Sequence, residues 1–407
     1  MLSLGWLTPG RKKLAANTAN FTVSRFITLA TRFVYLILVA RLLDQQLYGQ
    51  LAYAQSWYLA FFPIALFGLP TTVKRSIAFN RAEADRRVAL ASALRWLVLA
   101  VATLSCVLFA WLFESNSELL VVMLVFSLAI AGRATVSWFE SILLAHQLSS
   151  HSLKAALFFR PVELLFAVIV LLAGGSILHL ALVHGFVWIS QSLWLGAQAA
   201  KLITIPKSNW NIRGIWETAL VCLPIFGMAL TSSWMTQGAL ILYRHSNAPE
   251  MGSFAILIQL LVTLSMLPLA VTQSLLPALT RAFLRSDSKD YLYERYARRV
   301  ILGLGGIVAA FAAWLGPVLV PLILGDNYQI AGDFLGVALL VLAVVSVAII
   351  QQQVLIARGK HWPGMVISFV SLLLMLVVWQ LLSDSMGIAE MFVVMGCGIG
   401  ARMLFMS

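Results

Sequence analysis

Four arginines lie inside apolar stretches of this chain, where a charged side chain is costly. Arg25 and Arg32 lie within "SRFITLATRFVYLILVARLL", while Arg133 and Arg160 lie within later apolar runs. A charge that faces lipid at the centre of a membrane helix costs roughly 3 kcal/mol. We therefore expect these four guanidinium groups to face the interior of a helical bundle or a water-filled space.

The spacing of the first two arginines places them on one helix face. Seven residues separate Arg25 from Arg32, which puts them about 10 Å apart along the helix axis. Only two acids, Glu140 and Glu163, lie equally deep in apolar stretches, so positive charge is in excess. Guanidinium groups match phosphate oxygens with paired hydrogen bonds. The pattern therefore predicts that Arg25, Arg32, Arg133 and Arg160 bind the anionic part of a substrate.

Glu140 and Glu163 allow two interpretations of equal weight. In the first, Arg133 pairs with Glu163 and Arg160 pairs with Glu140, so that the charges only join two neighbouring helices. In the second, the two carboxylates position the arginines of a binding site or carry a coupling ion.

Neutral polar residues mark the other half of the chain, which has no charge deep in any apolar stretch. Gln237 and Gln259 lie among hydroxyl residues there. In the first half, the span 176–204 carries a polar stripe at seven-residue spacing, formed by His184, Gln191 and Gln198. Such a stripe is more typical of hydrogen bonds between helices than of ligand contacts. Gln191, Gln237 and Gln259 are the candidates for contacts to a neutral, sugar-like group.

The elements that must position these residues are membrane-spanning helices. Of the 407 residues, 61% are hydrophobic and only 11% are charged, and the mean hydropathy is +0.92. A bilayer core of about 30 Å requires roughly 20 apolar residues per helix. The sequence therefore predicts an all-α, polytopic membrane protein with twelve spans, at 14–41, 48–69, 88–113, 119–146, 153–173, 176–204, 215–243, 252–280, 297–324, 329–357, 362–382 and 387–406.

The distribution of basic residues predicts the orientation of the helices. Most of the 28 Lys and Arg residues fall at the N-terminus and in alternate loops, which is typical of the cytoplasmic side. Both termini are therefore expected in the cytoplasm. The first span follows "MLSLGWLTPGRKK" without a small-residue cleavage site, so no removable signal peptide is expected. The basic loops face anionic lipid rather than nucleic acid, since no nucleic-acid motif accompanies them.

The two halves of the chain resemble each other at a near-constant offset. Arg41, Gly49 and Ala52 align with Arg244, Gly252 and Ala255, and "RRVAL" at 86–90 mirrors "RRVIL" at 298–302. A duplication of six helices predicts two six-helix bundles, residues 1–204 and 205–407, related by an axis along the membrane normal. A cavity for alternating access would lie between them, and 201–214 would be the connector.

Cofactors and metals are not expected. Cys106, Cys222 and Cys397 each lie in an apolar stretch without a paired spacing or a histidine cluster, so we expect all three to pack in the core. Gly-rich phosphate loops and metal-ligand spacings are also missing from the sequence.

The sequence resembles a family of transporters. "ARLLDQQLYGQLAYAQS" and "ALFGLPTTVKRSIA" resemble the first helices of Wzx-type polysaccharide (O-antigen) flippases, which belong to the multidrug/oligosaccharidyl-lipid/polysaccharide exporter superfamily. Asp44 stands where that pattern usually has glycine. "LPIFGM", "PEMGSFAILIQL", "LLPALTRAF" and "LILGDNYQIAG" look like the second half of the same family.

This resemblance implies export of an undecaprenyl-pyrophosphate-linked oligosaccharide, such as an O-antigen repeat unit. The cargo would move from the cytoplasmic to the periplasmic leaflet of a bacterial inner membrane. Arg25, Arg32, Arg133 and Arg160 would then hold the pyrophosphate, and H⁺ or Na⁺ antiport would drive the cycle. No covalent step, and hence no enzymatic activity, is implied.

Two other functions are weighed against this one. A multidrug or cation antiporter of the same fold would need carboxylates where this chain has arginines. A membrane-bound polymerase or glycosyltransferase would need a long external loop or a soluble domain with clustered acids, and the chain has neither. The sequence favours the flippase over both.

Overall fold

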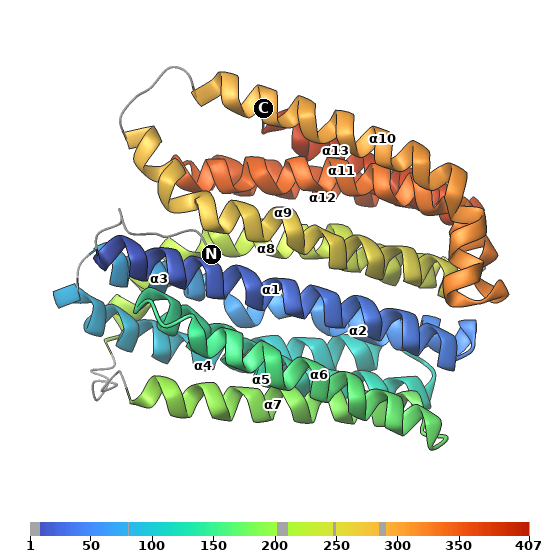
Figure 1. Cartoon of the computed structure of the whole chain (residues 1–407), viewed down its shortest axis with the longest axis horizontal. Helices are drawn as coiled ribbons and strands as arrows, with labels where there is room; N and C mark the ends of the chain where they lie inside the picture. Colours follow the sequence, from blue (N-terminus) through green and yellow to red (C-terminus); the bar gives the residue numbers. More distant parts are fainter. Residues whose placement is uncertain (1–8, 80, 202–210, 247–249, 285–289, 407) are drawn as a thin grey trace.

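The computed structural model describes residues 9–79, 81–201, 211–246, 250–284 and 290–406. Within these residues the secondary structure is helical throughout (Figure 1). The long helices are α1 (Pro9–Leu42), α2 (Gln45–Leu66), α4 (Arg81–Phe113), α5 (Ser117–Ala145), α6 (Ser150–Leu172), α7 (Ile177–Ala200), α8 (Ile212–His245), α9 (Met251–Leu284), α10 (Asp290–Leu324), α11 (Gln329–Ala357), α12 (His361–Leu382) and α13 (Ile388–Phe405). The short helices are α3 (Leu69–Phe79), η1 (Asp326–Tyr328) and η2 (Ser383–Ser385).

The polytopic all-α fold is confirmed. Among the described residues, 11 helices are long and apolar enough to cross a membrane. The twelfth expected span corresponds to α2, which has 22 residues and is thus about 33 Å long. Its Gln and Tyr side chains make it more polar than the other spans. The count of twelve spans and the cytoplasmic side of both termini stay predictions.

Most helix ends lie within a few residues of the expected ones, and α11 matches its expected range of 329–357. The larger differences are at the starts of α4 and α10, which begin at Arg81 and Asp290 where 88 and 297 were expected. The start of α1, at Pro9, and the end of α9, at Leu284, differ from 14 and 280. The segment between α2 and α4, expected as a loop, holds the amphipathic helix α3. The helical conformation is interrupted between α2 and α3 at Phe67 and Gly68, whose φ angles are 45° and 69°.

The helices sort by their position in the sequence (Figure 1). We call α1–α7 the first-half helices and α8–α13 the second-half helices. The two groups meet where α2 packs on α8 and α9 and where α1 packs on α9. The proposed boundary between residues 204 and 205, and most of the connector 201–214, lie outside the described residues.

Glycine permits the closest contact between the two groups. A Cβ atom on Gly252 of α9 would lie 2.2 Å from the carbonyl oxygen of Gln45, and a Cβ atom on Gly49 of α2 would lie 3.1 Å from the backbone nitrogen of Gly252. Both glycines belong to the aligned pairs of the sequence repeat. The buried side chains around them include Tyr53 and Tyr243.

The expectation for the cysteines is partly wrong. Cys106 and Cys222 are buried, whereas Cys397 is exposed. Cys397 lies on α13 beside Gly396 and Gly398, on a face of this terminal helix that no neighbouring helix covers. Periodicity alone could not distinguish that face from the packed one.

Candidate functional site

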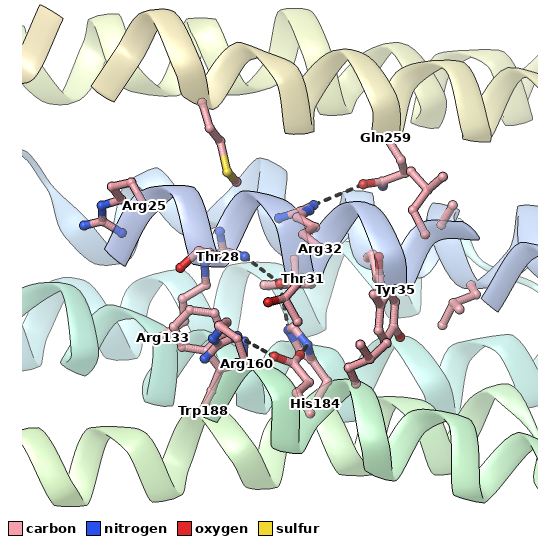
Figure 2. A pocket seen from close by; sticks show the side chains of 18 of the residues that line it. Arg25, Thr28, Thr31, Arg32, Tyr35, Arg133, Arg160, His184, Trp188 and Gln259 are labelled. Atoms are coloured by element: carbon pink, nitrogen blue, oxygen red, sulfur yellow. Dashed lines mark hydrogen bonds and ion pairs between the residues drawn. The ribbon is translucent and has the colours of Figure 1, made fainter. Parts of the chain in front are cut away.

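A cavity of about 310 Å³ lies inside the helical bundle (Figure 2). Its wall is formed by α1, α2, α5, α6, α7 and α9, so helices of both halves contribute. The polar lining residues are Arg25, Thr28, Thr31, Arg32, Tyr35, Tyr48, Gln55, Tyr58, Arg133, Arg160, Glu163, His184 and Gln259. All four arginines expected from the sequence thus line one cavity.

One face of α1 supplies the first part of the wall. Arg25, Thr28, Arg32 and Tyr35 recur at intervals of three and four residues, which is the spacing of one helix face, and all four line the cavity. The hydroxyl of Thr28 donates to the carbonyl oxygen of Ser24 at 2.9 Å. Because such a bond satisfies the hydroxyl within the helix, the arginines are the strong donors on this face.

Of the two α1 arginines that line the cavity, Arg25 is the more exposed, and it has a carboxylate partner. Its Nη2 atom lies 3.0 Å from Oε2 of Glu140 on α5, and the exposed fractions of the two side chains are 40% and 13%. Its Cζ atom also lies 4.7 Å from the ring centroid of Phe21. Arg25 therefore stands at the accessible end of the cavity, held by an acid and an aromatic ring.

Arg32 and Arg133 have neutral partners. Arg32 donates to Oε1 of Gln259 on α9 at 3.1 Å, which joins α1 to a second-half helix (Figure 2). Arg133 on α5 donates to the hydroxyl of Tyr58 at 2.7 Å. Among the described residues, neither guanidinium forms an ion pair. Both keep further N–H groups for another acceptor, because a guanidinium has five.

Arg160 and Glu163 form the buried side of the wall. Arg160 on α6 donates to Oε2 of Glu163 and to Oε1 of Gln191 on α7. The other oxygen of Glu163 lies 2.6 Å from Nδ1 of His184, which is also on α7. Arg160 and Glu163 are three residues apart on one helix, so their pairing is local. Both oxygens of this carboxylate are therefore occupied.

The ion pairs of the purely structural interpretation have other partners in the structure. That interpretation paired Arg133 with Glu163 and Arg160 with Glu140, but Arg160 pairs with Glu163 and Arg25 with Glu140. The expectation treated the two later helices alone. In the structure α1 packs against α6, and its Arg25 reaches α5. Arg25 therefore pairs with Glu140, while Arg160 pairs with Glu163 on its own helix.

The charge balance of the site is positive. Four guanidinium groups face two carboxylates, and each carboxylate is already engaged by an arginine. The uncommitted positive charge belongs to Arg32 on α1 and Arg133 on α5, which both line the cavity. This arrangement can bind an anion and disfavours an organic cation.

The three glutamines expected to contact a sugar lie in different places. Gln259 lines the cavity, and its Nε2 atom is buried without a hydrogen-bond partner in the described structure. Gln191 accepts from Arg160 and thereby supports the wall. Gln237 accepts from Ser56 at 2.9 Å, which joins α8 to α2 away from the cavity lining.

A buried arginine in the second half escaped the sequence interpretation. Arg402 on α13 is 4% exposed and donates to Ser232 and, at 2.8 Å, to Gln352. It lies near the C-terminal end of α13, where its position in the sequence gives no sign of burial. The second half therefore holds a buried guanidinium that the sequence did not single out.

Aromatic residues and a histidine complete the wall, and the sequence did not single out most of them. Tyr58 bonds Arg133, while the ring of Trp188 lies 5.1 Å from Cζ of Arg133 and 4.1 Å from Cζ of Arg160. His184 was noticed in the stripe of α7 but was assigned to helix packing. Its seven-residue spacing from Gln191 was the available signal, since both contact the Arg160–Glu163 pair.

Comparison with protein families gives one match that covers most of the chain. The profile of the family described as "Polysaccharide biosynthesis protein" matches residues 14–283. This range includes every residue of the cavity wall named above. A search of curated individual proteins gives no match.

Solved structures with the same fold are membrane transporters. An inward-facing multidrug resistance MATE family transporter of the MOP superfamily has a TM-score of 0.68 at 14% identity, covering 95% of each chain. A mutant of the Vibrio cholerae MATE transporter VcmN has a TM-score of 0.62 at 14% identity, covering 97% of this chain and 94% of that one.

A third structure comes from an archaeon. It is a MOP superfamily transporter from Pyrococcus furiosus, with a TM-score of 0.63 at 12% identity, covering 98% of this chain and 96% of that one. Its title states that the reverse polarity of its binding pocket suggests a different function. At these identities the three structures establish a shared fold.

Proposed function

Because the chain belongs to the polysaccharide biosynthesis protein family and has the fold of MATE/MOP transporters, we propose that it is a flippase for lipid-linked oligosaccharides. The cargo is an oligosaccharide on undecaprenyl pyrophosphate, such as an O-antigen repeat unit. It moves from the cytoplasmic to the periplasmic leaflet of a bacterial inner membrane. The observation that carries this proposal is the excess of guanidinium groups in a cavity between membrane-spanning helices.

The pyrophosphate is assigned to the four arginines. Arg32 and Arg133 make the first contacts, because their hydrogen-bond partners among the described residues are a neutral amide and a phenol. Arg160 is held in place by Glu163 and Gln191, and its positive charge adds to the electrostatic attraction for the pyrophosphate. Arg25 stands at the exposed end and exchanges Glu140 for a phosphate oxygen as the headgroup arrives. Arginine suits this role since its planar fork bonds two phosphate oxygens at once.

The first sugars are assigned to the neutral part of the wall. The unpartnered Nε2 atom of Gln259 is a donor that a sugar hydroxyl can satisfy. Gln191 and Gln237 are proposed as sugar contacts only in a state where the helices have moved, since each is engaged in another hydrogen bond. A cavity of about 310 Å³ has room for a pyrophosphate and roughly one attached sugar.

Translocation is proposed to proceed by alternating access of two six-helix units, residues 1–204 and 205–407. Arg32 and Gln259 join the units across the cavity, so a bound anion that withdraws Arg32 from Gln259 loosens this contact. An ion gradient, H⁺ or Na⁺, would drive the cycle, with Glu140 and Glu163 as candidate coupling groups. Nothing in this cycle requires a covalent intermediate.

A multidrug exporter is the second candidate, because the similar structures include multidrug transporters. An exporter of organic cations needs exposed carboxylates in its cavity. Here Glu140 and Glu163 are both neutralised by arginines. The Pyrococcus furiosus transporter, whose title describes a pocket of reversed polarity, supports the view that this fold serves other substrates.

The proposal is tested by flipping of a fluorescent undecaprenyl-pyrophosphate glycan in proteoliposomes. Arg32→Gln and Arg133→Gln remove one uncommitted charge each, and we expect about 10-fold slower flipping for either, the effect of losing one charge-assisted hydrogen bond. Arg213→Gln is the matched control, because Arg213 pairs with Glu217 and is 87% exposed. Unchanged flipping in both cavity variants would sink the proposal.

A further inference from the structure

A continuous series of hydrogen bonds runs along the cavity wall through His184. Arg133 donates to the hydroxyl of Tyr58 at 2.7 Å, and this hydroxyl lies 2.9 Å from Nε2 of His184. Nδ1 of the same imidazole lies 2.6 Å from Glu163, which also accepts from Arg160. The series therefore connects two of the four arginines through a phenol, an imidazole and a carboxylate.

The donors and acceptors in this series can be assigned from chemistry alone. A guanidinium only donates and a carboxylate only accepts, so Tyr58 accepts from Arg133 and Nδ1 of His184 carries a hydrogen. With a neutral imidazole, the Tyr58 hydroxyl donates to Nε2. With an imidazolium, Nε2 donates to the second lone pair of the Tyr58 oxygen instead. The Nε2 atom is thus the one place in the series that can take up a proton without breaking the bond to Glu163.

The charged groups that face His184 act on the two forms in opposite directions. Glu163 on α6 favours the imidazolium, whereas Arg160 on α6, Arg133 on α5 and Arg32 on α1 oppose a further positive charge. Tyr58 on α2 can form a hydrogen bond with either the imidazole or the imidazolium. The rings of Phe126 and Trp188, at centroid distances of 5.5 Å and 6.1 Å, shield the imidazole from lipid and strengthen these electrostatic effects.

We propose that Nε2 of His184 is a proton-binding site that fills when an anion occupies the cavity, so that the transporter takes up a proton with its cargo. This inference rests on the proposed function and concerns a proton carried with the cargo, which is separate from the H⁺ or Na⁺ antiport that would drive the cycle. The bound phosphate oxygens neutralise Arg32 and Arg133 and thereby remove the charges that oppose the imidazolium. The proton comes from solution and binds the Nε2 lone pair, and the Tyr58–His184 hydrogen bond reverses direction.

The coupling has a definite sign. Anion binding and protonation of His184 favour each other, so by linkage the affinity for the anion rises as the pH falls. The carboxylates do not serve as the site in this arrangement, because protonation of Glu163 or Glu140 would release a buried or half-buried arginine from its ion pair.

The experiment measures binding of the symmetric dimethyl ester of pyrophosphate to the full-length protein in detergent. This probe does not titrate near neutral pH, so any pH dependence belongs to the protein. Calorimetry in two buffers of different ionisation enthalpy gives the number of protons taken up per bound anion. The variants are His184→Gln and, as a matched control on the same helix, His179→Gln, whose ring bonds Ser176 at the exposed end of α7.

We expect wild type and His179→Gln to take up a fraction of one proton per anion, with binding about 10-fold tighter at pH 6 than at pH 8. His184→Gln should bind the anion without proton uptake at pH 6, and its affinity should change only about threefold near pH 8, where Lys74 titrates. Proton uptake at pH 6 that persists in His184→Gln, or anion binding by wild type without proton uptake, overturns the inference alone. Wild type that does not bind the probe at any pH overturns the proposed function as well.

A second measurement does not depend on the folding of a variant. The chain has 6 histidines, so ¹⁵N-histidine labelling of wild type gives a small set of ring signals. Addition of the probe should convert one Nε2 signal from the unprotonated to the protonated form at constant pH. Ring signals that do not change while the probe binds would overturn the inference.

Discussion

Arginines in this protein differ in what neutralises them, and that difference decides which of them can meet a substrate. Arg25 and Arg160 have carboxylates, Arg32 and Arg133 have a neutral amide and a phenol, and Arg402 has a hydroxyl and an amide. Arg402 does not line the cavity. The two arginines without acids in the cavity are therefore the centre of the proposed anion site.

Removal of the acid that neutralises Arg25 should strengthen anion binding. In Glu140→Gln, the Arg25 guanidinium keeps a hydrogen-bond partner but loses a negative charge at 3.0 Å. We expect about three- to tenfold tighter binding of the dimethyl pyrophosphate ester, because one more positive charge becomes available to it. Titration calorimetry measures this change. Weaker binding in Glu140→Gln would mean that the carboxylate serves the substrate rather than restrains Arg25.

Lys74, which is close enough to Arg25 and Glu140 to feel their charges, should give anion binding a separate pH dependence. It lies on α3, outside the spans, where burial and the neighbouring Arg25 lower its pKa to about 8 while Glu140 opposes the shift. Lys74 is therefore cationic at neutral pH and becomes neutral as the pH rises through about 8. Anion binding should weaken by about threefold over that rise, by loss of one partly screened charge.

Two substitutions isolate the contribution of Lys74. Lys74→Arg keeps its charge throughout the range, so its binding profile should be flat above neutral pH. Lys74→Met should bind more weakly than wild type at pH 7 and equally well at pH 9. If Lys74→Met shows the same pH dependence of anion binding as wild type, a group other than Lys74 causes that dependence.

The residue types of the site were predictable, but their partners were not. The four arginines and two glutamates stood out because charge in an apolar helix is rare, and the cavity contains or adjoins all of them. The partners depend on which helices become neighbours, which the sequence does not state. Tyr58, Trp188 and His184 were missed as site residues because aromatic and histidine residues are also common in packed helix interfaces.

Helices were predicted more accurately than the side chains they carry. Apolar runs of the right length fixed the spans to within a few residues, and α11 was placed at its observed ends. The amphipathic helix α3 was not predicted, because its polar face resembles a loop. It follows a turn in which Phe67 and Gly68 have positive φ angles, and it contains Lys74.

The crossing of α2 and α9 should tolerate no side chain at Gly252. In Gly252→Ala the added Cβ would lie 2.2 Å from the Gln45 carbonyl oxygen, so backbone atoms must move. We expect a loss of about 1–3 kcal/mol of stability, as for other overpacked sites. Thermal unfolding in detergent measures it.

Gly306→Ala provides the matched control for this crossing. Gly306 lies within α10, and an added Cβ meets nothing within 4 Å. Its stability should be equal to wild type or higher, because alanine is the better helix former by about 1 kcal/mol. Equal stability of Gly252→Ala and Gly306→Ala would contradict the close crossing.

The whole molecule shows a reciprocal contact between its halves that fits the sequence repeat. Arg41 at the end of α1 donates to the carbonyl oxygens of Leu322 and Ile323 at the end of α10. Its counterpart Arg244 at the end of α8 lies 4.0 Å from Glu114, just beyond the end of α4. Each half thus reaches the matching helix of the other, as an axis along the membrane normal predicts.

These contacts should hold the predicted periplasmic end closed. Arg41→Ala with Arg244→Ala removes both, and we expect the population open at that end to rise about fivefold, the effect of about 1 kcal/mol. Spin labels at Glu118 and Asp384, both exposed at that end of α5 and after α12, report the distance between the halves. An unchanged distance distribution would show that other contacts close this end.

The charge preference of the cavity is the claim on which the whole account depends. The most direct measurement compares binding of the dimethyl pyrophosphate ester and of tetraphenylphosphonium to the purified wild-type protein, with Arg32→Gln/Arg133→Gln as the reference for an emptied site. The account predicts saturable binding of the anion, its loss in the double variant, and no saturable binding of the cation. Saturable binding of the cation, with none of the anion, would contradict it.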